Sequence, residues 1–97
     1  MAELFPLGEI VISSNAYQIL DREDLLSNLD RHAQGDWGKS SEFSREYNDR
    51  LLAETNLDLT SSYEDRHGVC FCITTHRDRF FTVIHLLTEM EVEHPGR

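Results

Sequence analysis

The hydrophobic pattern of the chain changes from helical to strand-like near Leu57, and this change limits what the chain can fold into. Before that point, apolar side chains recur every three or four residues along two segments, which is the spacing of an amphipathic helix. After it, three short apolar runs are separated by polar turns, which is typical of antiparallel strands. We therefore expect an α+β fold in which helices pack on one face of a mainly antiparallel sheet.

The first third of the chain predicts a strand followed by helices. A β-branched run at 7–12 predicts the strand, and Ser13 can cap one or two helical turns after it. Asp21 then precedes an acid-rich first turn, and Gly35 stands where a left-handed C-terminal cap belongs. Apolar residues between these two positions repeat at helical spacing, so we expect a helix from Asp21 to Gly35.

A second amphipathic helix is predicted from about residue 41 to residue 54. Phe43, Tyr47 and Leu51 recur every four residues and form one apolar stripe. Since such a stripe needs a surface to cover it, we expect this helix to pack on the sheet beside the first one.

The second half predicts a three-stranded meander at 57–63, 69–74 and 80–87. The middle run is apolar on both faces and is therefore expected to lie centrally. The last run, if it lay at a sheet edge, would favour pairing with a second copy and hence a homodimer. The predicted order is β-α-α-β-β-β, with two to three helices on a sheet of three to four strands. These elements form a single domain spanning residues 1–88, followed by a flexible acidic tail at 89–97.

The charge balance excludes some classes of partner. The chain has 97 residues, with 18 acidic and nine basic side chains, and a formal charge of −9. Because the basic residues are scattered, we expect no direct binding to nucleic acid and none to anionic membranes. The acidity serves solubility, or it attracts a basic protein or mimics nucleic acid. The N-terminus lacks the pattern of a secretory signal, so we expect a cytoplasmic protein.

One segment, R-H-x-x-G-D-W-G at 31–38, is specific enough to suggest a relationship. Together with downstream positions it resembles a family of small bacterial proteins, often encoded on plasmids and other mobile elements, whose activity is not established. The resemblance spans residues 7–87 and implies the fold and a shared surface. The residues that carry it are Arg31, His32, Gly35, Asp36, Trp37 and Gly38, with Tyr63, Ile73, Thr74, Asp78, Arg79 and Thr82.

Two interpretations of this segment remain open. In the functional one, Asp36 orients His32 as a general base and Trp37 walls a pocket. In the structural one, Gly35 ends the helix, Asp36 caps backbone donors and Trp37 fills the core. We favour the structural interpretation, because each residue then has a sufficient local reason to be there. Candidate residues for a binding surface are Arg31, His32, Asp36, Trp37, Asp78 and Arg79.

No metal or cofactor is expected. One segment has the composition of a zinc site, with His67, Cys70, Cys72 and His76. On an extended strand, however, the two histidines would lie too far apart to bind the same ion. There is no phosphate-binding loop and no nucleophile elbow.

We therefore expect a non-enzymatic protein-interaction module, with a nucleic-acid-processing protein as one class of partner. The alternative is a small hydrolase or nuclease-like enzyme that uses His32 and Asp36.

Overall fold

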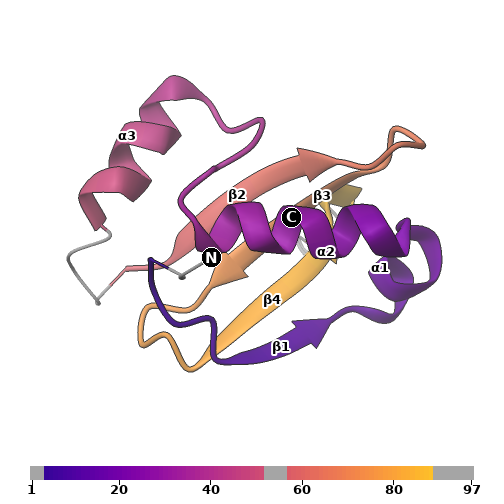
Figure 1. Ribbon diagram of the computed structural model, residues 1–97, viewed down its shortest axis with the longest axis horizontal. Helices are drawn as coiled ribbons and strands as arrows, with labels where there is room; N and C mark the ends of the chain where they lie inside the picture. Colours follow the sequence, from indigo (N-terminus) through magenta and orange to yellow (C-terminus); the bar gives the residue numbers. More distant parts are fainter. Residues whose placement is uncertain (1–3, 52–56, 89–97) are drawn as a thin grey trace, which may run out of the picture.

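The computed structural model describes residues 4–51 and 57–88, which form a four-stranded mixed sheet and three helices (Figure 1). The α+β class and the order of the elements are as predicted. The proposed tail at 89–97 and the predicted end of the second helix lie outside the described residues. The elements are β1 (Glu9–Ile12), α1 (Ser14–Ile19), α2 (Arg22–Ala33), α3 (Glu42–Leu51), β2 (Leu59–Glu64), β3 (Cys70–Thr75) and β4 (Phe81–Leu86).

The strands lie in the order β1-β4-β3-β2. The last three form the predicted antiparallel meander, and β3 has the predicted central position. β1 pairs with β4 in parallel, with Ile10 opposite Thr82 and Ile12 opposite Ile84. β4 is thus paired along both edges. It is therefore not available to pair with a second copy of the chain, as the sequence suggested for a strand at a sheet edge. The edges of the sheet are β1 and β2.

The ends of α2 are those that the sequence predicted. The side chain of Asp21 accepts a hydrogen bond from the Asp24 amide at 3.0 Å, which caps the N-terminus. At the other end, Gly35 has a φ of +81°. The amide of Asp36 donates to the carbonyl of Arg31 at 2.9 Å and that of Gly35 to His32 at 3.1 Å. This pair of bonds is a Schellman motif, which favours glycine because the left-handed conformation is strained for other residues.

The main core lies between α2 and the sheet, and α1 closes one end of it (Figure 1). Leu25 of α2 packs in a cluster with Ile73 of β3 and Ile84 of β4, all almost fully buried. Ala16 of α1 belongs to the same cluster. Full burial of a side chain such as Leu or Ile stabilises the fold by roughly 1.5–3 kcal/mol, so this face of the sheet holds the main hydrophobic stabilisation.

The placement of α3 differs from the prediction. It lies beside the outer edge of β2 and not over the sheet (Figure 1), and Phe43 is 74% and Tyr47 40% exposed. The two rings stack on each other, with centroids 6.4 Å apart. The prediction was wrong because α1 and α2 already cover the helix side of the sheet, and the loop before α3 is bonded to the edge of β2 through a bridge between Gly38 and Ser62.

No helix in the described part of the chain is long and apolar enough to cross a membrane.

Candidate functional site

His32 of α2 points into the protein and is fully buried. Its Nδ1 contacts the Ser61 hydroxyl of β2, and its Nε2 lies 2.9 Å from the Thr75 hydroxyl of β3. Thr75 in turn lies 2.8 Å from the hydroxyl of Thr82, which donates to the carbonyl of Leu7 at 2.7 Å. A chain of hydrogen bonds therefore ties α2 to three strands and to the segment before β1.

Burial lowers the pKa of His32 far below that of a histidine in water. Removal from water lowers the pKa of the imidazole to about 3, and the positive charge of Arg79 adds to the effect. The ring is therefore neutral at physiological pH. Since both nitrogens are engaged by hydroxyl groups, His32 has no nitrogen directed toward solvent or a substrate.

Asp36 lies outside this network, on the surface. Its carboxylate accepts two hydrogen bonds from Arg31, at 2.8 and 3.2 Å, and a third from the Gly38 amide. The Arg31 guanidinium holds the pKa of Asp36 below its usual range. That guanidinium also lies over the ring of Tyr63, whose hydroxyl donates to the Asp36 carbonyl at 2.6 Å. Asp36 thus fixes the turn after α2, and the His32–Asp36 pair of the enzyme alternative is not formed.

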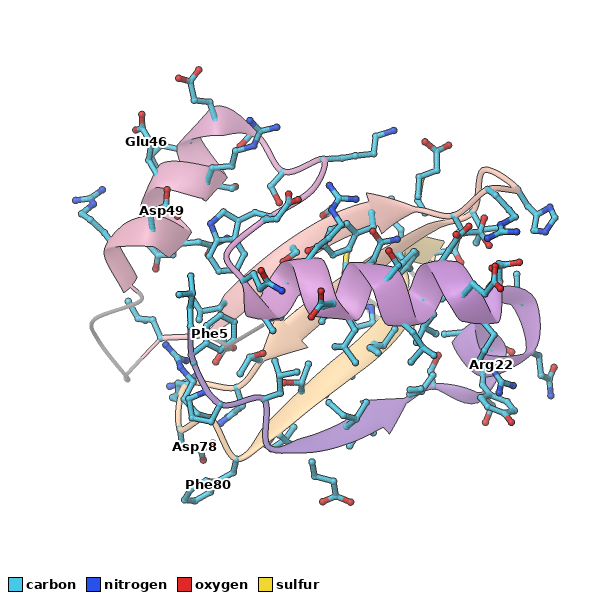
Figure 2. All side chains as sticks on the ribbon, in the orientation of Figure 1. Phe5, Arg22, Glu46, Asp49, Asp78 and Phe80 are labelled. Carbon is cyan, nitrogen blue, oxygen red and sulfur yellow. The ribbon has the colours of Figure 1, made fainter. Side chains whose placement is uncertain are left out.

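Trp37 is buried and joins the turn to α3. Its indole Nε1 donates to the carboxylate of Asp49 at 2.8 Å, and its ring packs with Phe5 and Leu59 in a second, smaller core. Phe5, which belongs to this core, and Asp49 of α3 are labelled in Figure 2. Trp37 therefore fills space between elements and walls no pocket at the His32 ring.

The structure brings Arg79, but not Asp78, to this second core. Arg79 is almost completely buried in the turn before β4, where its guanidinium donates to the carbonyls of Leu57 and His76 and lies 5.8 Å from the Phe5 ring. Asp78 is exposed in the same turn (Figure 2), where it caps the Phe80 amide and contacts His76. His32, Asp36 and Asp78 each bind other partners, so the shared cleft that the sequence suggested is absent from the described residues.

The cysteines have no arrangement typical of a reactive or metal-binding site. Cys70 is exposed, Cys72 is buried, and both are free thiols. Burial raises the pKa of Cys72, which disfavours the thiolate that metals and electrophiles require. Among the described residues, no three His, Cys, Asp or Glu side chains cluster in a way that could hold a metal ion.

A groove lies on the face of the sheet opposite α2. One row of directly paired residues crosses all four strands on this face, formed by Val11, Val83, Thr74 and Thr60. A cavity of about 440 Å³ lies over the first three members of the row. Val11, Phe81 and Val83 supply its apolar lining, and its polar lining consists of Ser13, Asp58, Thr74, His76 and His85.

A second cavity of about 370 Å³ continues the groove toward α3. It lies over Thr60, the last member of the row, and reaches Asn48 and Tyr47 of α3. Asp58 lines both cavities, and Thr74 of the first is paired with Thr60 of the second, so the two cavities adjoin. The Thr60 and Thr74 hydroxyls are 3.1 Å apart. They lie where the first cavity, with its apolar floor, meets the second, which is lined mainly by polar side chains. Because the two cavities lie along a row that crosses all four strands, this surface can accommodate an extended chain.

Sequence reasoning missed this surface, although one signal for it was present. In β4, Phe81 and Val83 alternate with the core residues Thr82 and Ile84, so the strand carries apolar side chains on both faces. Only one of those faces is covered by helices. The second apolar face could have been taken as evidence for a binding surface.

Comparisons with protein-family models, with curated proteins and with solved structures gave no match.

Proposed function

We propose that this protein is a non-enzymatic protein-interaction module that binds a segment of a basic partner protein in the groove opposite α2. The observation that carries the proposal is the pair of adjoining cavities, which lie along one row of paired residues from Val11 to Thr60 and reach α3. An apolar floor with polar groups at its margin is the usual composition of a protein-binding patch.

The residues that first suggested catalysis support this proposal indirectly. His32 is neutral and enclosed, and the Asp36 carboxylate binds Arg31. Both are accounted for by the stability of the fold, so the binding surface has to be sought elsewhere. The two cavities opposite α2 form a concave surface of the described residues that none of these structural contacts occupies.

The charge of the chain suggests the class of partner. With 18 acidic residues against nine basic ones, the protein attracts basic surfaces over a distance and repels acidic ones. Proteins that process nucleic acids carry such basic surfaces, which makes them the leading class of partner. If the resemblance to proteins of mobile elements holds, the partner is to be sought in a bacterial cell.

The test uses a charge placed on the floor of the groove. Val83→Arg adds a long cationic side chain in the middle of the row, whereas Leu26→Arg makes the same charge change on α2, where Leu26 is 56% exposed. Both variants and the wild type are used to capture proteins from a bacterial lysate, and the bound proteins are quantified. We expect a partner that is lost at least tenfold with Val83→Arg, retained with Leu26→Arg, and released by increasing salt.

Circular dichroism and thermal unfolding confirm that each variant folds, and Thr74→Arg replaces Val83→Arg if the latter does not. A partner captured equally by the groove variants and the wild type would contradict the proposal, as would the absence of any protein that distinguishes the groove variants from Leu26→Arg.

A further inference from the structure

The two edges of the sheet differ in how they are protected. An edge strand exposes backbone N–H and C=O groups that can pair with another chain, and proteins normally cover or block such edges. Other parts of the described chain cover the edge at β2, whereas none of the described residues covers the edge at β1. We propose that β1 binds an extended, basic segment of the partner protein as a fifth strand, an inference that rests on the proposed interaction function.

The outer edge of β2 is occupied by the chain itself. The Ser62 amide donates to the Trp37 carbonyl at 3.3 Å, and the Lys39 amide donates to the Ser62 carbonyl at 2.7 Å. The Asn48 side chain donates to the carbonyl of Thr60 at 2.9 Å. The turn after α2 therefore binds the N–H and C=O groups of Ser62, and α3 binds the C=O group of Thr60. These are backbone groups that a partner strand at this edge would otherwise use.

At the outer edge of β1, the described residues leave the outward backbone groups without a neighbouring strand. The amides of Glu9 and Ser13 donate to carbonyls at either end of β4, at 2.9 and 3.0 Å. In a parallel ladder the residues that bond a given neighbour alternate along the strand. Ile10 and Ile12 therefore direct their N–H and C=O groups away from β4, toward the outside.

The side chains of β1 give this edge only partial protection. The strand Glu9–Ile12 contains neither proline nor lysine, the residues that commonly block an edge, and Glu9 is its one charged side chain. Ile10 is 38% exposed on the helix side of the sheet, and Val11 is 43% exposed on the groove side. A strand added here would find an apolar neighbour on each face, and its groove-side residues would extend the row that begins at Val11.

The charge of the chain identifies the occupant as a basic segment and not a second copy. Two copies would bring a formal charge of −9 each to an edge of only four residues. Such a short pairing buries much less than the roughly 1,200 Å² of a stable interface, so little would offset the repulsion. A segment with alternating apolar and basic side chains instead gains the backbone bonds and an attraction to Glu9, which lies on the groove side next to Val11.

The test uses synthetic peptides and amide hydrogen exchange measured by NMR on the whole chain. The probe is an eight-residue peptide of alternating valine and lysine with blocked ends. Its control has the same sequence with alternate backbone nitrogens methylated, which preserves the side chains and removes donors. We expect the probe to slow exchange of the Ile10 and Ile12 amides at least tenfold and leave the Ser62 amide unchanged, while the methylated peptide has no such effect.

Ile10→Pro supplies an independent arm. Proline removes the outward N–H and is tolerated where an edge strand faces solvent. We expect it to weaken binding of the probe at least tenfold, whereas Ile10→Val, which retains the N–H, stays within twofold of the wild type. If Ile10→Pro fails to fold, Ile10→Lys, which adds a like charge facing the lysine-rich probe, takes its place.

Several outcomes would overturn the inference. Equal protection by the two peptides would show that backbone pairing is not involved, and protection of Ser62 in place of Ile10 would place the strand at the other edge. A third outcome is a dimer, detected by sedimentation without peptide, in which the Ile10 and Ile12 amides are already protected from exchange. It would identify a second copy of the chain as the occupant. If Val83→Arg abolishes capture of the cellular partner and Ile10→Pro does not, the groove proposal stands and the strand inference fails.

Discussion

At the scale of single residues, the segment that most resembled an active site proves to hold the fold together. His32 bonds two hydroxyls inside the protein, Asp36 binds Arg31 across the turn, and Trp37 bonds Asp49 of α3. A histidine and an aspartate close in sequence are equally compatible with catalysis and with structure. Only the directions of the two side chains distinguish these roles, and the direction of His32 depends on partners 29 and 43 residues later in the chain.

The buried imidazole predicts a specific pH dependence of stability. Because burial lowers the pKa of His32 to about 3, the unfolded chain, in which a histidine has a pKa near 6.5, binds the proton more readily. His32 therefore contributes stability above pH 6.5 that is lost progressively as the pH falls toward 3. We expect the free energy of unfolding to fall by about 2–3 kcal/mol between pH 7 and 4.5 from this group alone.

Urea denaturation of the wild type and of His32→Gln, which cannot titrate, isolates this contribution as the difference between the two pH profiles. In parallel, the NMR shift of the His32 ring should stay constant from pH 7.5 to 4.5. A ring that titrates with a midpoint near 6.5 in the folded protein would contradict the burial described here.

Two glycines with the same backbone conformation should differ sharply in their tolerance of a side chain. Gly38 and Gly68 have φ values of +68° and +82°. A Cβ at Gly38 would lie 2.2 Å from the Ser62 carbonyl, whereas at Gly68 its nearest neighbour is the Glu64 carboxylate at 3.6 Å. We expect Gly68→Ala to cost only the strain of the left-handed conformation, about 1–2 kcal/mol.

Gly38→Ala adds a steric displacement to that strain, so we expect a cost of about 2–5 kcal/mol. Thermal unfolding of both variants measures the difference, and similar melting temperatures would show that the Gly38–Ser62 bridge does not constrain the chain.

At the scale of elements, the sequence predicts those features that depend on neighbouring residues. The limits of α2 follow from Asp21 and Gly35, and the meander follows from alternation and turn residues. The position of β1 beside β4 could not be predicted, because it joins segments some seventy residues apart and leaves no local pattern. The exposure of Phe43 was missed for the same reason, since a periodic stripe shows that a helix forms and not what covers it.

Helix α3 is held by polar bonds more than by its apolar stripe, and this is testable. Phe43 is largely exposed, so Phe43→Ala should change the free energy of unfolding by less than about 0.5 kcal/mol. Asn48 is buried and donates to the carbonyl of Thr60. Asn48→Ala leaves that carbonyl without its partner and should cost about 1–3 kcal/mol.

Urea denaturation measures both changes, and hydrogen exchange should show faster opening of α3 in Asn48→Ala than in Phe43→Ala. A larger loss with Phe43→Ala would indicate that the aromatic stripe packs against the protein in solution. That outcome would contradict a helix held mainly by the bond from Asn48 to Thr60.

At the scale of the whole molecule, charge opposes the compact state. Nine more acidic than basic side chains repel one another, and only some are compensated locally. Arg66, in the turn between β2 and β3, illustrates the compensation. Its guanidinium lies within 3.0–3.3 Å of the carboxylates of Asp21, Glu23 and Asp24 at the start of α2. A single arginine thus links the sheet to α2 and reduces the repulsion among three acids, of whose charge it offsets one unit.

This balance predicts how stability responds to salt. Salt screens charges over a Debye length of about 10 Å at 0.1 M, so it relieves the general repulsion and also weakens exposed ion pairs. The repulsion involves the whole surplus of acidic side chains, whereas each exposed ion pair contributes little to stability. We therefore expect the wild type to melt at a higher temperature in 0.5 M than in 0.02 M sodium chloride.

Arg66→Gln should lower the melting temperature clearly at low salt and much less at high salt. Arg22→Gln makes the same charge change where the guanidinium lies over the Tyr17 ring, and should have a small effect at both concentrations. Equal losses for the two variants at low salt would show that net charge, and not the Arg66 cluster, sets the response.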